Sequence, residues 1–384
     1  MPSPPDPPAA SSSPGDARPG ARVVPAGWQR NALFFLATVA SCFYTYYRMS
    51  PPWVAARHAA EYTAALLAIL VSHELGHYIA ARIHKVDASL PYFLPLPVVS
   101  PFGTLGAVIR MRAVIPTRRA LLDIGASGPL AGMAVAIPLY AWGLRTSAVV
   151  SVDSSADAGI QLGDSLLSRL LDRLFAAPVP DGMDIALSPV AFAAWAGMFV
   201  TMLNLLPAGQ LDGGHVAYAL FGPRQDRVAR WAHRSVLAFF FVSLGSYVAR
   251  DLSAGLRLWH LGRDVDDAIF WLVYFEVLAV LGSVSSTGDR GTLSPTTRGV
   301  ATLGLALLAG FARDETSPLL WGSWFVGLGL LLVMELRWGA LRPDSGLVDH
   351  PPTGAQRLGR GRVAVAIVTL ALFALLFMPT PMAM

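Results

Sequence analysis

The stretch AALLAILVSHELGHYIAARIH, residues 64–84, combines two properties that seldom occur together. It is apolar and long enough to cross a bilayer, whose hydrocarbon core needs about 20 residues of helix. It also contains His73, Glu74 and His77 in a His-Glu-x-x-His arrangement. Ionisable groups at membrane depth are costly and usually functional. The stretch therefore predicts a membrane helix that carries a reactive site.

The whole chain has the composition of a polytopic membrane protein. Of its 384 residues, 54% are hydrophobic and only 14% are charged, whereas soluble domains carry about 25% charged residues. The apolar residues form blocks, so the expected fold class is an all-α polytopic membrane protein with about nine transmembrane segments. The blocks cover residues 31–48, 62–82, 120–143, 189–207, 235–249, 268–285, 298–312, 318–336 and 363–380.

The charged loops predict an orientation in the membrane. Segments 82–119, 208–234 and 337–362 are rich in arginine, whereas segment 146–188 is rich in aspartate. The positive-inside rule places the three basic segments and the N-terminus in the cytoplasm, and the acidic segment outside. The net charge of +4 is therefore attributed to topology, and no basic stripe with interleaved aromatic residues indicates nucleic-acid binding.

Four regions follow from these patterns. Residues 1–27 are rich in proline and serine and predict a disordered tail. Residues 28–59 contain the first membrane segment, residues 60–222 the reactive core, and residues 223–384 additional transmembrane helices. The single cysteine, Cys42, excludes both a disulfide within the chain and a cysteine-based zinc site.

The His-Glu-x-x-His motif predicts a metal site. Residues four apart lie on one face of a helix, so His73 and His77 can direct both imidazoles at one ion. Glu74 lies beside them, as does the general base of helical zinc proteases. A catalytic zinc needs a third protein ligand and keeps a fourth position open.

The third ligand is expected in NLLPAGQLDGGHVAYALFG, residues 204–222, where Asp212 follows the end of an apolar block. Gly213 and Gly214 allow the chain to approach another element closely at this point. The loop charges put Asp212 and the two histidines at a similar depth near the cytoplasmic face. His215 is the weaker alternative ligand.

Two glycine-containing stretches lie between these motifs. In GTLGAVIRM, residues 103–111, glycines stand beside β-branched residues, which favours a short strand or hairpin. An exposed strand edge could hold an unwound substrate by adding it as a further strand. In DIGASGPLAG, residues 123–132, small residues favour close helix packing around the site. Asp123 is a helix cap, a support of the site, or neither.

Three motifs in this order resemble the site-2 protease family of intramembrane zinc metalloproteases. They are HELGH, NLLPAGQLDGGH about 130 residues later, and PFGTLGAVIRMRAVIPTRRALLDIGASGPLAG at residues 101–132. The nearest subgroup includes plant chloroplast members and bacterial relatives, and the resemblance covers about residues 60–222. It implies one Zn²⁺ per chain, held by His73, His77 and Asp212, with Glu74 activating the zinc-bound water. It also implies that Asn204 contacts the substrate or the oxyanion, and that a strand clamps the substrate at Gly103, Thr104, Leu105 and Gly106.

The expected function is therefore regulated intramembrane proteolysis, in which a zinc metalloendopeptidase cleaves transmembrane proteins or peptides. The expected partners are this substrate, the lipid bilayer and a regulatory membrane protein. The expected location is multi-pass in a bacterial inner membrane, with the active site near the cytoplasmic side; a plastid membrane is the competing location. The alternatives are an inactive protease-like scaffold and a membrane metal or ion transporter. The transporter is disfavoured because no second polar cluster is visible in the later helices.

Overall fold

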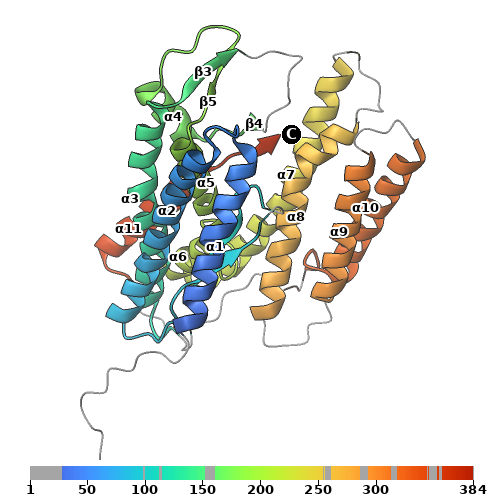
Figure 1. Ribbon diagram of the computed structural model, residues 1–384. Coiled ribbons are helices and arrows are strands. Elements are labelled where there is room, and N and C mark those ends of the chain that lie inside the picture. Colours follow the sequence, from blue (N-terminus) through green and yellow to red (C-terminus); the bar gives the residue numbers. More distant parts are fainter. Residues whose placement is uncertain are drawn as a thin grey trace, which may run out of the picture.

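The computed structural model is mainly helical, and a helix covers all or most of each of the nine apolar blocks (Figure 1). It describes residues 28–97, 100–111, 115–151, 161–253, 255, 261–285, 293–312, 318–343, 345, 353 and 357–383; the tail predicted at 1–27 lies outside them. The nine helices are α1 (Trp28–Met49), α2 (Ala55–Ile83), α3 (Arg118–Leu144), α5 (Pro189–Asn204), α7 (Gln225–Ser253), α8 (Leu261–Ser285), α9 (Pro295–Ala312), α10 (Pro318–Trp338) and α11 (Arg360–Leu376). Two short helices, α4 (Leu166–Phe175) and α6 (Asp212–Phe221), and the 3-10 helix Gly222–Arg224 complete the helical part of the described chain.

Four stretches within the described residues are long and apolar enough to cross a membrane: Ala55–Ile83, Arg118–Leu144, Asp212–Ser253 and Leu319–Trp338. The nine predicted helices are therefore confirmed, but nine membrane crossings are not. Helix α5 is apolar but has 16 residues, which at 1.5 Å per residue reach only about 24 Å. A hydrocarbon core is about 30 Å thick.

The predicted hairpin near residues 103–111 is confirmed. Strand β2 (Thr104–Val108) pairs antiparallel with β1 (Tyr92–Pro95). Gly103 and Gly106 have φ of 75° and 94°, a conformation that favours glycine. The Ser41 hydroxyl of α1 donates to the carbonyl of Gly103 at 2.5 Å, which fixes the hairpin against the first helix. The other strand pairs are β3 (Ala148–Ser151) with β5 (Met183–Ala186), and β4 (Gln161–Leu162) with β6 (Met382–Ala383).

Two groups of helices lie side by side in Figure 1. Helices α1–α6 and the C-terminal helix α11 form one group, called here the core, and α7–α10 form the other, called here the bundle. Helix α5 lies at the centre of the core, where thirteen of its sixteen residues are buried. Its aromatic side chains Phe192, Trp195 and Phe199 stack along one side. Because α5 is held so firmly, the loop that follows it has a fixed starting point.

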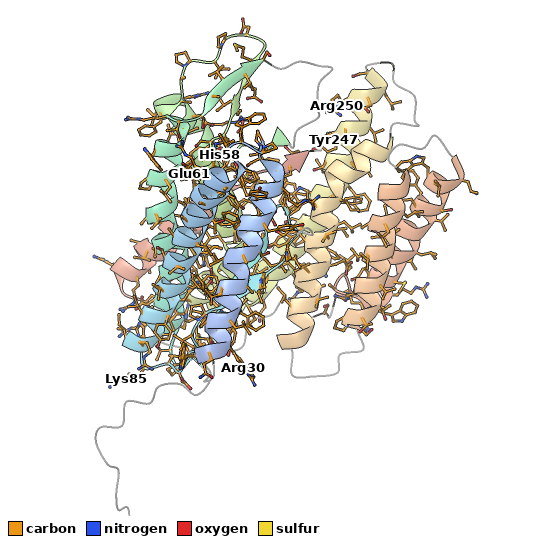
Figure 2. All side chains as sticks on the ribbon, in the orientation of Figure 1. Arg30, His58, Glu61, Lys85, Tyr247 and Arg250 are labelled. Carbon is orange, nitrogen blue, oxygen red and sulfur yellow. The ribbon has the colours of Figure 1, made fainter. Side chains whose placement is uncertain are left out.

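The basic and acidic segments of the core lie at different ends of the molecule. Arg30 and Lys85 lie at one end of the core and His58 and Glu61 at the other (Figure 2). The acidic segment that contains α4, β3 and β5 lies at the end opposite Lys85 (Figures 1 and 2). Segments that the charge pattern assigns to opposite sides of a membrane therefore lie at opposite ends of the molecule.

Candidate metal centre

The two motif histidines lie on one face of α2, as their spacing predicts. His73 and His77 are 5% and 7% exposed, so both imidazoles are inside the protein. Their rings stand edge to face with centroids 4.9 Å apart, and their Nε2 atoms are 3.1 Å apart. One turn of helix thus directs two ring nitrogens at the same point.

Asp212 enters from the start of α6 because the preceding loop folds back tightly. A side chain at Gly213 would meet the carbonyl oxygen of Leu205, and one at Gly214 would meet that of Gly209. Gly209 itself has a φ of 53°. The first turn of a helix also favours a carboxylate electrostatically. The Asp-Gly-Gly sequence is therefore what allows the carboxylate to reach the histidines of α2.

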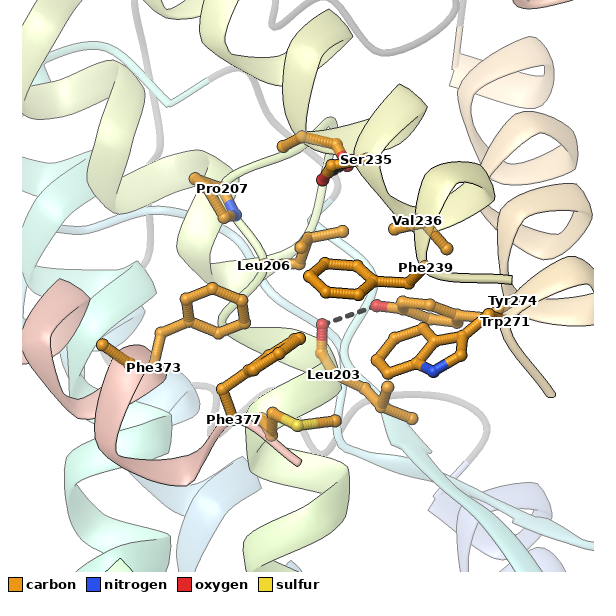
Figure 3. A pocket seen from close by; sticks show the side chains of 13 residues that line it. Leu203, Leu206, Pro207, Ser235, Val236, Phe239, Trp271, Tyr274, Phe373 and Phe377 are labelled. Carbon is orange, nitrogen blue, oxygen red and sulfur yellow. Dashed lines mark hydrogen bonds between the residues drawn. The ribbon is translucent and has the colours of Figure 1, made fainter. Parts of the chain in front are cut away.

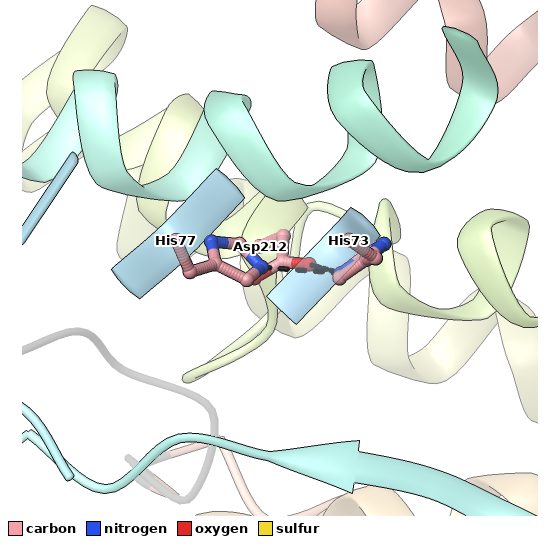
Figure 4. Close-up of side chains that lie close together, drawn as sticks. All are labelled: His73, His77 and Asp212. Atoms are coloured by element: carbon pink, nitrogen blue, oxygen red, sulfur yellow. Dashed lines mark hydrogen bonds and ion pairs between the residues drawn. The ribbon is translucent and has the colours of Figure 1, made fainter. Parts of the chain in front are cut away.

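The structure brings the three predicted ligands together (Figure 4). Asp212 Oδ2 lies 3.1 Å from His73 Nε2, and Asp212 Oδ1 lies 3.2 Å from His77 Nε2. Among the described residues, these three form the only group of histidine, cysteine or acidic side chains arranged to hold a metal ion. Ligand atoms at about 2.0 Å around a tetrahedral zinc stand about 3.3 Å apart. The observed separations are close to that spacing.

A backbone hydrogen bond fixes the orientation of His77. Its Nδ1 lies 2.7 Å from the carbonyl oxygen of Ile124, which can only accept, so Nδ1 carries the hydrogen. In the neutral ring Nε2 then presents a lone pair to the Asp212 carboxylate and to His73. Electron pairs that converge in this way need a positive charge between them, so the donor set fits a bound cation. Hydrogen bonds of this kind orient histidine ligands in metal sites.

Glycines of α3 make room for the histidines. A Cβ atom at Gly128 would lie 2.1 Å from His77 Nε2, and one at Gly132 would lie 3.2 Å from the Cβ of His73. Gly125 faces His215 in the same manner, at 2.8 Å from its Cβ. The glycines expected to allow close packing therefore pack directly against histidine side chains. His215 lies on α6 and is not part of the three-residue group.

The remaining predicted site residues lie around this group. Glu74 is 5% exposed and interacts electrostatically with His73, His77 and Asp212. Asn204 is the last residue of α5 and is partly buried. In the proposed clamp, the Thr104 side chain is buried and donates to the carbonyl of Leu94, whereas Leu105 is 64% exposed. The strand thus offers one anchored face and one open face.

An apolar pocket of about 340 Å³ lies where the core meets the bundle (Figure 3). Leu203 and Leu206, which flank the end of α5, form one side, and Phe239 of α7 and Trp271 of α8 form the other. The Tyr274 hydroxyl donates to the carbonyl of Leu203 at 2.7 Å. This contact connects α8 to the residue before Asn204. No pattern in the sequence indicates this pocket, because four separate segments line it.

Asp123 joins three helices at the end of the core near Lys85. Its carboxylate lies 2.8 Å from His84 Nε2, at the end of α2. It also accepts hydrogen bonds from two nitrogens of Arg362, on α11, at 2.7 to 3.1 Å. Of the roles left open for Asp123, the observed one is a bridge between helices. His84 is therefore engaged with Asp123 and not with the three-residue group.

The fold and site define a helical membrane-type protein whose buried two-histidine, one-aspartate group suits a metal ion. Comparison with known proteins gives a family match: residues 61–243 match the model of peptidase family M50, which confirms the resemblance to site-2 proteases. No solved structure matches the chain.

Plant chloroplast proteins are among the similar relatives. The chain is 34% identical over 165 residues to the probable zinc metalloprotease EGY1 of Arabidopsis thaliana, covering 41% of this chain and 29% of the relative. It is 31% identical over 154 residues to the probable zinc metalloprotease EGY2 of the same plant, covering 40% and 27%. For EGY1 of Oryza sativa subsp. japonica, the identity is 34% over 165 residues, covering 41% and 27%. The chain thus spans less than a third of the length of these relatives.

Proposed function

We propose that the chain is an intramembrane zinc metalloendopeptidase that cleaves transmembrane substrates. The observation that carries this proposal is the convergence of His73, His77 and Asp212, with Glu74 beside them, on a helix long enough to span a bilayer. Polar groups are tolerated at membrane depth when they are buried in protein or line a wet cavity. Hydrolysis of peptide bonds within the membrane requires polar groups at that depth, which would explain why they are buried there.

The residues divide into distinct roles in this proposal. His73, His77 and Asp212 would hold the ion, and the Ile124 carbonyl keeps His77 in the tautomer that presents Nε2. Zinc at such a site supplies Lewis acidity, which lowers the pKa of a water molecule and polarises the scissile carbonyl. Glu74 would take the proton of the attacking water and return it to the leaving amine. Asn204 would donate its side-chain amide to the substrate backbone or to the developing oxyanion.

Substrate binding is assigned to the hairpin and the apolar pocket. In the two-stranded β1–β2 sheet, the far edge of β2 pairs with no other described strand, and Leu105 and Val108 are 64% and 54% exposed. This edge can receive an extended segment by β-augmentation. The pocket beside Asn204 suits apolar side chains from a membrane segment. A regulatory membrane partner, a cytoplasmic N-terminus, an active site near the cytoplasmic side and a bacterial inner membrane belong to the same proposal. The relatives named above are chloroplastic.

The first test is metal content by elemental analysis of the detergent-purified chain. About one zinc per chain is expected in the wild type and in Glu74→Gln, because Glu74 is not assigned as a ligand. Zinc should be lost in His73→Ala and Asp212→Ala and kept in His58→Ala, a histidine at the opposite end of α2. His215→Ala tests the weaker ligand and should also keep zinc. A wild type that takes up no zinc, even after reconstitution with the ion, would contradict the proposal.

The second test separates an enzyme from a scaffold. Wild type and Glu74→Gln are reconstituted in liposomes with a transmembrane reporter peptide, and the products are measured by mass spectrometry. Cleavage that depends on Glu74 supports the protease. Wild-type protein that binds zinc and peptides but forms no product across a panel of transmembrane segments favours the inactive scaffold.

A further inference from the structure

A second set of buried charges lies in the bundle, on helices that do not contribute to the metal centre. Glu276 of α8, Arg298 of α9 and Glu335 of α10 are 3%, 0% and 2% exposed. Isolated charges are costly in such surroundings unless they are paired or neutralised. The pairing of these three side chains therefore shows whether their charges are balanced within the bundle.

Only one of the two carboxylates has direct partners. Arg298 Nε lies 3.3 Å from Glu335 Oε1, and Glu335 Oε2 accepts the backbone N–H of Ala340 at 2.8 Å. Among the described residues, neither oxygen of Glu276 has a hydrogen-bond partner. With both carboxylates ionised, two negative charges face one positive charge. The cluster is therefore one positive charge short of neutrality.

Neighbouring groups do not supply that charge. Glu335 and Arg298 are the charged groups that act electrostatically on Glu276. On α7, His233 Nε2 lies 2.9 Å from the carbonyl of Phe275, and its ring stacks on the Phe275 ring at 4.2 Å. Arg234, also on α7, donates to the carbonyls of residues 341 and 342 beyond α10. Both α7 groups are thus engaged elsewhere.

Glu276 and Glu335 both line a small cavity in the bundle. Its volume is about 10 Å³, and Glu276 and Glu335 are its only acidic lining residues, the rest being leucine and phenylalanine. A space of this size holds about one water-sized particle. Carboxylate oxygens are ligands for hard cations. A divalent ion would leave the cluster with an excess positive charge among apolar side chains, whereas a monovalent ion would neutralise it.

We propose that this cavity is a monovalent-cation site, in which Glu276 with Glu335 binds either Na⁺ or a proton. Both ligands supply the single positive charge that the cluster lacks. The site does not depend on the peptidase function, because its charged residues lie on α8, α9 and α10, whereas Leu237 and Phe241 of α7 contribute only apolar lining. It would stabilise the bundle by binding the folded state and not the unfolded one.

The test measures the thermal unfolding midpoint of the purified full chain in detergent, with its zinc. Wild type, Glu276→Gln and the control Glu61→Gln are compared at pH 8.5, with NaCl replaced stepwise by choline chloride at constant ionic strength. A sodium site raises the midpoint of wild type and Glu61→Gln by about 2–4 °C and leaves Glu276→Gln unchanged. A proton site gives no sodium effect, but wild type gains stability relative to Glu276→Gln when the pH falls from 8.5 to 6.

Identical responses of wild type and Glu276→Gln to both sodium and pH would overturn the proposal. If Glu276→Gln does not fold, the wild type alone decides. NaCl is titrated into it calorimetrically at pH 8.5, and its infrared spectrum is compared at pH 6 and pH 8.5. A saturable heat identifies sodium, and a carboxylic-acid band that disappears at pH 8.5 identifies a proton. Absence of both signals overturns the proposal.

Discussion

Both the core and the bundle contain buried ionisable side chains, but the two regions pair them differently. In the core, His77 is engaged at both ring nitrogens, by Ile124 on one side and by Asp212 and His73 on the other. In the bundle, Glu276 has no hydrogen-bond partner among the described residues. In a site suited to an ion, the ligands come from several elements of the fold, and hydrogen bonds orient each of them. The bundle cluster lacks one positive charge and contains only one ion pair. Its side chains are therefore less extensively paired than those of the core site.

Most glycines of the core helices also have closer neighbours than most glycines of the bundle. In the core, a Cβ at Gly76 would lie 2.5 Å from the Ser127 carbonyl oxygen, and one at Gly197 would lie 2.8 Å from Ile69. In the bundle, Gly245 and Gly304 have open space where a Cβ would lie. Small residues thus bring the core helices into close contact. In the bundle, Gly327 is an exception, since its Cβ would lie 2.7 Å from a Leu305 side-chain atom.

The largest effect is expected from Arg298→Met, which removes the only cation of the bundle cluster. Leaving buried carboxylates unpaired costs about 3–5 kcal/mol. Adding Glu335→Gln to this variant should restore more than half of the lost stability, because Gln keeps an acceptor for Ala340 without the charge. Reversible unfolding in mixed detergent measures both variants.

The matched control for that cycle is Arg57→Met, which breaks the pair with Glu61 at 2.8 Å near the surface. Its effect should stay within about 0.5 kcal/mol. If Arg298→Met were equally harmless, the bundle charges would be accessible to water and the contrast with the core would fail.

A smaller effect on stability, but a large one on zinc, is expected from Gly128→Ala. The added methyl group would overlap His77 Nε2, so α2 and α3 must separate, at a cost of about 1–3 kcal/mol. Zinc affinity should fall at least tenfold, because the ligand loses its orientation. Gly304→Ala, in the open environment of α9, should gain up to about 1 kcal/mol from helix propensity and keep its zinc. Equal zinc contents in the two variants would show that the α3 glycines are not needed for the site.

The smallest effect concerns a partnered carboxyl group at the edge of the core. Burial raises the pKa of Asp172, on α4, to about 6, although the Tyr140 hydroxyl donates to it at 2.9 Å. A carboxyl with a raised pKa in the folded state favours folding when protonated, so its contribution is lost as the pH rises from about 4 to about 6. Asp172→Asn should remove this loss, which we place on the order of 1 kcal/mol after allowing for solvent screening.

The measurement for Asp172 is the free energy of unfolding against pH, with Asp181→Asn as an exposed control. Subtraction of the Asp172→Asn curve from the wild-type curve isolates the single group. A difference that does not change between pH 4 and pH 7 would mean that water reaches Asp172 as freely as it reaches Asp181.

Local patterns in the sequence were sufficient for the helices and for the ligand group. Apolar blocks predicted all nine long helices, and the spacing of His73 and His77 placed both on one face. The partner strand β1 was missed because YFLP ends in proline and is too short to show alternation. The placement of α11 in the core was also missed, since an apolar helix does not encode which neighbours it contacts.

The bundle cluster was missed for a related reason. Glu276, Arg298 and Glu335 are isolated in separate apolar segments, and only packing brings them together. The expectation that no polar cluster occurs in the later helices is therefore wrong. This removes one objection to ion binding by the bundle, but it does not weaken the match of residues 61–243 to the model of peptidase family M50.

The contact between Asp123 and Arg362 also has a consequence for the order in which the protein is made. The two residues are 239 positions apart, and β6 pairs with β4 still closer to the C-terminus. A ribosome therefore releases His73, His77 and Asp212 long before it delivers the helix that completes their surroundings. The nascent core must wait, with the α3 and α6 surfaces uncovered, until residues 360–383 have been synthesised and inserted.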